Sequence, residues 1–252
     1  MVAMDLLGRF FGSHRTLSVH VGRDKVEVFD WGHERTVKFN GVVYSRLNTE
    51  SVYTHEYWDF FAPLGFVWNA PKVLMIGLGG GTIAYQMHKL KGNSISIEAV
   101  EVNREMVGVM NAFLNEDVPL KVTIADGAEY VKKARGYGII ILDAYINDLI
   151  PEQFISETFV SDVNDALSDD GIFALNYIRS SNGYEKFDRY VGMLKKHFRV
   201  YKVDSGMMTF NTILVCSKKY DKETIFSRIR AAFGNDKAGE YVLSGYERMS
   251  EL

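Results

Sequence analysis

Three acidic residues, Glu101, Asp126 and Asp143, stand where a carboxylate could bind or deprotonate a ligand. Each lies at, or directly after, the carboxyl end of a run of apolar, β-forming residues. In a sheet of parallel strands these ends meet at one edge, and ligands bind in the crevice beyond it. A solvated surface carboxylate would explain any one of the three, but three strand ends together predict a ligand-binding edge.

A glycine-rich turn, running from Gly77 to Gly81, belongs to the same predicted edge. It follows the apolar run 72–76 and precedes a segment whose apolar residues have helical spacing. Glycine lacks a Cβ and tolerates positive φ, so the backbone can approach a ligand, and the following helix N-terminus offers free N–H groups. We assign Gly77, Gly79 and Gly81 to cofactor binding; a structural turn without a ligand is the alternative for these glycines taken alone.

Two of the acids complete a nucleoside-binding pattern with this turn. Glu101 follows Gly77 by about two dozen residues, a position from which a carboxylate accepts hydrogen bonds from ribose hydroxyls. Asp126 and Gly127 suit adenine, because the carboxylate accepts from the exocyclic amine and the glycine leaves room for a flat base. The pattern predicts a nucleoside site without separating dinucleotides from ligands of the S-adenosylmethionine type.

Asp143 ends the continuous apolar run 138–142 and has two chemical roles open to it. It can hold a cationic substrate through charge-assisted hydrogen bonds, or it can accept the proton of an attacking amine as a general base. The roles are compatible, because an amine must lose a proton to expose its lone pair. A sulfonium donor reacts by in-line displacement, which requires positioning and a desolvated cavity.

The elements that would position these residues fall into two groups. The first sixty residues read as short β-strands joined by turns such as Asn40-Gly41, a typical hairpin signal. From Lys72 onward, strand and helix patterns alternate, which predicts a mostly parallel sheet with helices on both faces. We therefore predict a small N-terminal β domain at residues 1–55 and a Rossmann-like catalytic domain at residues 56–252.

The C-terminal half of the pattern refines this α/β fold class. The runs 198–204 and 209–216 predict a terminal antiparallel hairpin, which favours the S-adenosylmethionine-dependent transferase form of the Rossmann-like sheet. A helix is expected to begin at Pro151 and to carry apolar residues as far as Leu167. A turn at residues 168–171 should then lead into a strand at 172–177.

Composition excludes several classes of function. A net charge of −3 without a basic stripe gives no reason to expect a nucleic-acid partner. No apolar run approaches the ~18–20 residues that cross a bilayer, so we expect no membrane contact and a cytoplasmic location. Cys216 is the one cysteine and the six histidines lack metal-ligand spacing, so no metal is expected.

Taken together, the motifs resemble those of the spermidine synthase (polyamine aminopropyltransferase) family. The resemblance covers roughly residues 16 to 217 and rests on the N-terminal hairpins and on seven motifs, which occupy residues 41–43, 53–56, 73–81, 101–103, 126–127, 141–143 and 151–159. It implies a donor substrate, decarboxylated S-adenosylmethionine, and an amine acceptor such as putrescine or another polyamine. We also expect a homodimer or homotetramer.

The resemblance also implies roles for individual residues. Glu101 would bind the ribose, Asp126 the adenine, and Asp143 would deprotonate the attacking amine. The residues assigned to the acceptor are Tyr53, His55, Tyr145 and Asp148.

Three features depart from the family pattern, and they leave the reaction open. The family's Tyr-His-Glu signature appears with an extra residue, as Tyr53-Thr54-His55-Glu56. Gly80 stands where the family carries an aspartate that binds the donor's aminopropyl amine, and Ile146 stands where the loop after Asp143 usually has a second acid. Three functions therefore remain: aminopropyl transfer to an amine, methyl transfer from S-adenosylmethionine, and nucleoside binding without catalysis. An intact Asp143 argues against the last of these.

Overall fold

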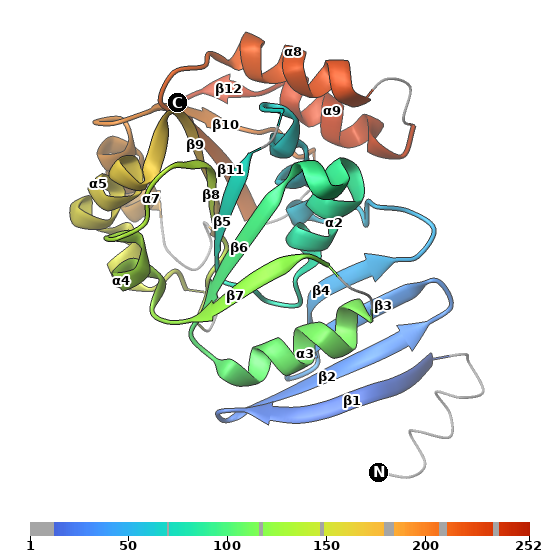
Figure 1. Cartoon of the computed structure of the whole chain (residues 1–252). Helices are drawn as coiled ribbons and strands as arrows, with labels where there is room; N and C mark the ends of the chain where they lie inside the picture. Colours follow the sequence, from blue (N-terminus) through green and yellow to red (C-terminus); the bar gives the residue numbers. More distant parts are fainter. Residues whose placement is uncertain are drawn as a thin grey trace.

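The chain forms two β-sheets with helices packed around the larger one (Figure 1). The computed structural model describes residues 13–69, 71–115, 118–146, 149–178, 184–206, 211–233 and 237–252. Among the helices of these segments, none is long and apolar enough to cross a membrane.

The N-terminal sheet is a four-stranded antiparallel meander. Its strands, in spatial as well as chain order, are β1 (Ser13–Val21), β2 (Asp24–Trp31), β3 (Glu34–Phe39) and β4 (Val42–Asn48). Val26, Val28 and Val37 are fully buried on the inner face, against which helix α3 (Arg104–Leu114) packs. A sheet this small cannot bury a core alone, so the contact with α3 stabilises it.

The larger sheet has eight strands in the order β12-β10-β11-β9-β8-β5-β6-β7. Their bounds are β5 (Lys72–Ile76), β6 (Ser96–Glu101), β7 (Leu120–Ile124), β8 (Tyr137–Leu142), β9 (Leu167–Ile178), β10 (Arg199–Lys202), β11 (Asn211–Ser217) and β12 (Ser250–Glu251). Strands β7, β6, β5, β8 and β9 pair in parallel, whereas β11 is antiparallel to both β9 and β10. The predicted fold class, a mostly parallel sheet with a terminal antiparallel hairpin, is confirmed.

Helices cover both faces of this sheet (Figure 1). They are α2 (Thr82–Lys91), α3, α4 (Gly127–Val131), α5 (Glu157–Ala166), α7 (Tyr184–Leu194), α8 (Lys222–Phe233) and α9 (Glu240–Glu247). The central strand β5 shows why both faces need cover, because its successive side chains alternate between two cores. Val73 and Met75 join the core under α2, α3, α8 and α9, whereas Leu74 and Ile76 join the core under α4, α5 and α7.

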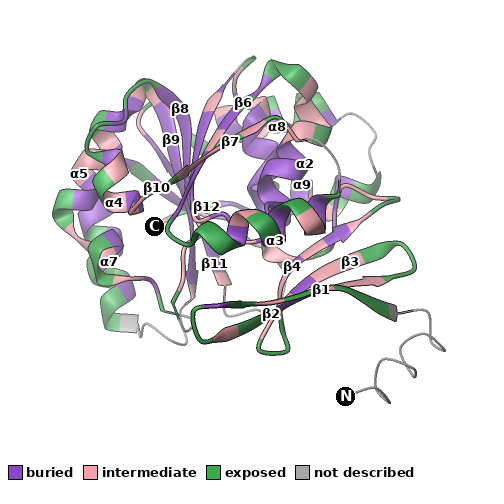
Figure 2. Cartoon of the chain, turned by 60° about the horizontal axis from the view of Figure 1, so that its bottom comes forward, coloured by how far each residue is buried: buried purple, intermediate pink, exposed green. Residues whose placement is uncertain are grey.

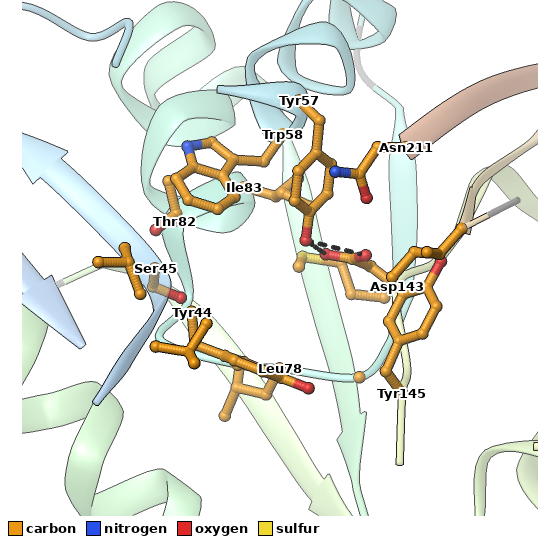
Figure 3. A pocket seen from close by; sticks show the side chains of 16 residues that line it. Tyr44, Ser45, Tyr57, Trp58, Leu78, Thr82, Ile83, Asp143, Tyr145 and Asn211 are labelled. Carbon is orange, nitrogen blue, oxygen red and sulfur yellow. Dashed lines mark hydrogen bonds between the residues drawn. The ribbon is translucent and has the colours of Figure 1, made fainter. Parts of the chain in front are cut away.

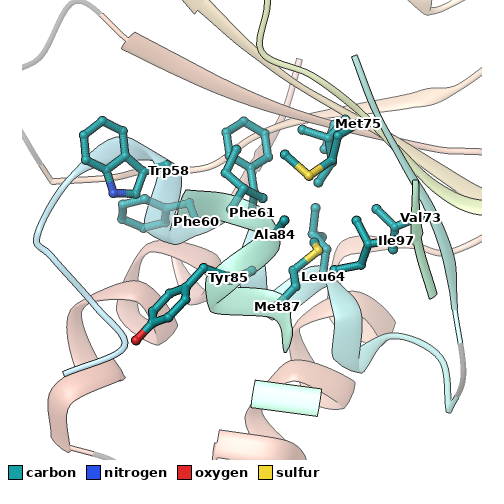
Figure 4. Close-up of a cluster of buried hydrophobic side chains, with 14 of the residues drawn as sticks. Trp58, Phe60, Phe61, Leu64, Val73, Met75, Ala84, Tyr85, Met87 and Ile97 are labelled. Atoms are coloured by element: carbon teal, nitrogen blue, oxygen red, sulfur yellow. The ribbon is translucent and has the colours of Figure 1, made fainter. Parts of the chain in front are cut away.

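The core under α2 also contains the aromatic segment that joins the two sheets. Short 3₁₀ helices, η1 (Tyr57–Phe60) and η2 (Ala62–Phe66), place Phe60, Phe61 and Leu64 against Met75, all essentially buried (Figure 4). Figure 2 shows the same division across the molecule: the central strands are buried, while much of β1 is exposed. The buried aromatic segment thus fixes η1 beside the edge at which the parallel strands end.

Three details differ from the sequence-based expectation. The helix after Pro151 is split into the 3₁₀ helix η4 (Glu152–Ile155) and α5, because the Ser156 hydroxyl caps α5 by accepting from the Phe159 N–H at 3.2 Å. Residues 168–171 are not a turn but part of β9, which already pairs with β8 at Leu167. Helix α9 and strand β12, at the C-terminal end, are present in the structure but were not predicted from the sequence.

Candidate functional site

The glycine turn brings strand β5 against the strand end that carries Asp143. Gly77 has φ +92°, and a Cβ on it would lie 2.4 Å from the Asp143 carbonyl oxygen. The Asp143 N–H donates to the Ile76 carbonyl at 3.0 Å across this contact. Gly79 and Gly81 also have positive φ, +51° and +84°, and Gly81 stands directly before helix α2. Such a backbone favours glycine at all three predicted positions.

Glu101 is a buried carboxylate that fastens the glycine turn. One carboxylate oxygen accepts from the Leu78 N–H at 3.1 Å, and the other accepts from the Asn103 N–H at 2.8 Å. Only 8% of the residue is exposed. A carboxylate has about four acceptor positions, so these two bonds leave acceptor capacity for ligand hydroxyls.

Asp126 caps helix α4 at the end of the next strand. Its Oδ1 accepts from the N–H groups of Ala128 at 2.9 Å and Glu129 at 3.0 Å, and its Oδ2 accepts from the Gln153 amide at 3.2 Å. A Cβ on Gly127 would lie 2.4 Å from the Ile76 side chain. The close packing of α4 against β5 is therefore enough to explain a glycine at position 127. Gly127 gives no independent evidence for a bound adenine base.

Asp143 is held by side chains. The Tyr57 hydroxyl donates to its two carboxylate oxygens at 3.1 and 3.3 Å (Figure 3), and the Asn176 amide donates to Oδ1 at 3.3 Å. Burial raises the pKa of Asp143 to about 6, while the hydrogen bonds from Asn176 and Tyr57 act in the opposite direction. The pKa of Tyr57 lies well above its usual value, because of burial and the neighbouring Asp143 charge, so this hydroxyl stays a donor.

A buried acid, Asp59, fixes the turn that presents Tyr57. It is fully buried and accepts from the Thr54 N–H at 2.8 Å, the Gln86 amide and the Tyr241 hydroxyl. These donors belong to the segment before η1, to α2 and to α9. The position of Tyr57 therefore depends on elements that are far apart in the sequence.

A cavity lies between the glycine turn, η1 and strand β4, with Asp143 in its wall (Figure 3). The residues that line it are Val42, Val43, Tyr44, Ser45, Tyr57, Trp58, Met75, Gly77, Leu78, Gly79, Thr82, Ile83, Asp143, Tyr145, Ile178 and Asn211. Asp143 is the sole ionised side chain among these described lining residues. Glu101 and Asp126 do not line this cavity.

The N-terminal sheet contributes directly to the glycine turn. The Gly80 N–H donates to the Ser45 hydroxyl at 2.9 Å, and the Thr82 hydroxyl donates to the Arg46 carbonyl at 3.2 Å. A Cβ on Gly80 would lie 2.7 Å from the Ser45 Cβ and 2.9 Å from the Phe113 ring. An aspartate cannot occupy position 80 unless both neighbours move, so Ser45 and Phe113 account for the departure at Gly80.

The four residues assigned to the acceptor have different locations. Tyr53 is buried, with its ring stacked on Phe233 at a centroid distance of 5.9 Å, and the exposed His55 stacks on Tyr241 at 4.5 Å; neither lines the cavity. Tyr145 does line the cavity, and its hydroxyl donates to the Asn176 carbonyl. Asp148 lies outside the described residues.

Sequence reasoning missed Tyr57, Asn176 and Ser45. Tyr57 belongs to an aromatic-rich stretch in which core packing explains most rings, and no spacing distinguishes it. Asn176 could have been identified from the sequence, because it is a polar residue near the carboxyl end of an apolar strand. Among the described residues, no three His, Cys, Asp or Glu side chains gather in a way that could hold a metal ion.

The fold and its site together define a Rossmann-like α/β domain that carries a small N-terminal β-sheet. A probable spermidine synthase from Corynebacterium glutamicum has this fold: the TM-score is 0.71 over 91% of this chain and 94% of that one, at 15% sequence identity. The sequence profile described as "Spermine/spermidine synthase domain" matches residues 60–203. The chain belongs to this family.

Two curated relatives carry different activities in their names. The polyamine aminopropyltransferase of Chromobacterium violaceum is 35% identical over 133 residues, which cover 50% of this chain and 51% of that protein. The human eEF1A lysine and N-terminal methyltransferase is 28% identical over 159 residues, which cover 57% of this chain and 22% of that protein. The chain thus matches about half the length of the first relative and less of the second.

Proposed function

We propose that the chain is a transferase that moves an aminopropyl group from decarboxylated S-adenosylmethionine to an amine. The observation that carries this proposal is Asp143: a carboxylate with a raised pKa, beside the glycine turn, in the wall of a cavity. Membership of the spermine/spermidine synthase domain family and the similarity to a polyamine aminopropyltransferase support the same reaction.

Asp143 acts as the general base in this reaction. The amine arrives protonated, and the ionised carboxylate takes one proton, so the nitrogen lone pair becomes free to attack the carbon beside the sulfonium. A carbon–nitrogen bond forms while the carbon–sulfur bond breaks, and the positive sulfonium leaves as a neutral thioether. Tyr57 and Asn176 keep the carboxylate oriented during the transfer.

Glu101 and the glycine turn bind the nucleoside of the donor. The Glu101 carboxylate has acceptor capacity for the ribose hydroxyls, and its bond to the Leu78 N–H keeps the turn in position. Asp126, fixed as the cap of α4, accepts from the exocyclic amine of adenine. No described residue needs a metal ion for these roles.

Methyl transfer from S-adenosylmethionine is the second candidate, because one observation favours it. Ser45 and Phe113 fill the space beside Gly80, so the glycine turn offers no carboxylate to the amine of a decarboxylated donor. A neutral turn also avoids repelling the carboxylate of intact S-adenosylmethionine. The similarity to a lysine and N-terminal methyltransferase agrees with this candidate.

A competition between the two donors tests the proposal. The protein is incubated with an amine mixture and either donor, and products are identified by mass spectrometry. Aminopropyl transfer predicts product with decarboxylated S-adenosylmethionine and none with the intact donor; the reverse result would establish methyl transfer. Binding of a donor by calorimetry without either product would contradict both reactions and indicate a nucleoside-binding protein.

A further inference from the structure

We propose that the acceptor is a primary amine with a single positive charge on an apolar body, rather than a diamine. This inference rests on the proposed amine transfer and concerns the second end of the acceptor. The first end is the attacking nitrogen at Asp143. The surroundings of Asp143 decide what the rest of the molecule can be.

The described lining of the cavity holds one negative charge. Of its sixteen residues, Asp143 alone carries a carboxylate, and that carboxylate is needed at the attacking nitrogen. The other polar side chains are neutral, and several are already engaged. The Thr82 hydroxyl donates to the Arg46 carbonyl, and the Tyr145 hydroxyl donates to the Asn176 carbonyl.

Three further carboxylates, Glu56, Asp59 and Glu101, are close to the cavity in the fold but are not among its lining residues. Glu56, which precedes Tyr57, pairs with Arg46 at 3.4 Å. Asp59, which follows Trp58, is fully buried and accepts from several donors within the fold. Glu101 does not line the cavity; the Leu78 and Asn103 N–H groups bind its carboxylate, and its remaining acceptor capacity is directed at the ribose in the proposed function. None of the three faces the cavity as a free acceptor for a second ammonium group.

The remaining walls of the cavity are apolar and aromatic. Val43 and Ile178 supply aliphatic surface. Leu78 and Ile83 add to it, and Trp58 supplies a large ring (Figure 3). A hydrocarbon body gains free energy by leaving water for such a surface. A second ammonium group loses its hydration there, and aromatic rings replace only part of it. The cavity therefore favours a methyl end over an ammonium end.

The test compares two acceptors of the same length, butane-1,4-diamine and pentan-1-amine, which differ by one ammonium in place of one methyl group. The kcat/KM for aminopropyl transfer, or for methyl transfer if that donor is used, is expected to be at least about tenfold higher for pentan-1-amine. An equal or higher value for the diamine would overturn the inference. Transfer to neither amine, nor to any other amine, would instead contradict the proposed function.

A substitution that adds a charge to the wall provides the matched test. Asn211 lines the cavity and accepts from the Asn176 amide at 2.9 Å, a bond that an aspartate of the same shape can keep. Asn211→Asp should shift the preference toward the diamine by at least about fivefold, whereas the neutral control Asn211→Gln should not. A wild-type preference for the diamine that disappears in Asp148→Asn would overturn the inference and assign the second charge to Asp148.

Discussion

The acids at the sheet edge are held in two different ways. Glu101 and Asp126 accept hydrogen bonds from backbone N–H groups, at the glycine turn and at the start of α4. Asp143 receives its hydrogen bonds from two side chains, Tyr57 and Asn176, at 3.1 to 3.3 Å. Backbone donors cannot rotate away, so the first two carboxylates are fixed in place, whereas the third depends on the packing of other elements.

This difference suits different tasks. A fixed carboxylate surrounded by N–H groups binds hydroxyl and amine groups of a ligand without rearrangement. Asp143 has a pKa of about 6, so it is ionised near neutral pH yet able to take up a proton. A general base works best when its pKa lies near the working pH. In the proposed function, the edge thus separates a binding end, with Glu101 and Asp126, from a proton-transfer end, with Asp143.

The largest expected effect is at the proton-transfer end. Asp143→Asn keeps the shape and the bond from Tyr57 but removes the proton acceptor, so turnover should fall about 10²–10⁴-fold. Donor affinity, measured by calorimetry, should change little. Exposed Asp188→Asn is the matched control and should retain wild-type turnover. Full turnover by Asp143→Asn would remove the distinction between the two ends.

Glu101→Gln tests the binding end. The substitution replaces the charged acceptor of the ribose hydroxyls by a neutral amide, so donor affinity should fall by the value of a charged hydrogen bond, about 1.5–3 kcal/mol, or one to two decades in Kd. The same amide also weakens the bond from the Leu78 N–H that holds the glycine turn. Turnover at saturating donor should remain within a few-fold of wild type. Unchanged Kd by calorimetry would show that Glu101 does not contact the donor.

Tyr57→Phe tests whether side chains tune Asp143. The Tyr57 hydroxyl donates to the ionised carboxylate and so lowers its pKa; without that bond the pKa should rise above about 6. The acidic limb of the rate profile should move upward by about one pH unit, equivalent to about 1.4 kcal/mol. An unchanged pH profile in Tyr57→Phe would mean that the Tyr57 hydroxyl does not influence the pKa of Asp143.

The smallest effect is expected at Asp126. Asp126→Ala removes the cap of α4, which should lower the free energy of unfolding by about 0.5–2 kcal/mol, measured by denaturant titration. Asp126→Ser retains a capping oxygen and should recover most of that stability without restoring donor affinity. If Asp126→Ser binds the donor as tightly as wild type, Asp126 is only a cap.

Much of the fold and part of the site followed from local sequence patterns. The apolar runs, the glycine turn and the strand-end acids are neighbours in sequence, so their periodicity and spacing predicted the sheet and the places of Glu101, Asp126 and Asp143. Tyr57 could not be found this way. It reaches Asp143 across 86 positions in the chain, through a turn fixed by Asp59 and α9.

The same limit explains the assignments of Tyr53 and His55. A motif in the sequence placed them near an acceptor, but the side chains that surround them, Phe233 and Tyr241, come from the C-terminal helices. Likewise, Gly80 reads as a missing acid until Ser45 of the N-terminal sheet is seen to fill its space. The surroundings of Tyr53, His55 and Gly80 are set by contacts between segments that are distant in the sequence. Local sequence patterns carry no information about such contacts.

The pH dependence of kcat at saturating donor and amine tests the central claim most directly. If Asp143 is the general base, kcat should be constant at neutral pH and fall as the pH drops through about 6, because the protonated carboxyl cannot accept a proton. The residual activity of Asp143→Asn should lack this inflection. A wild-type profile that is flat through pH 6, or the same inflection in Asp143→Asn, would contradict the assignment of Asp143 as the base.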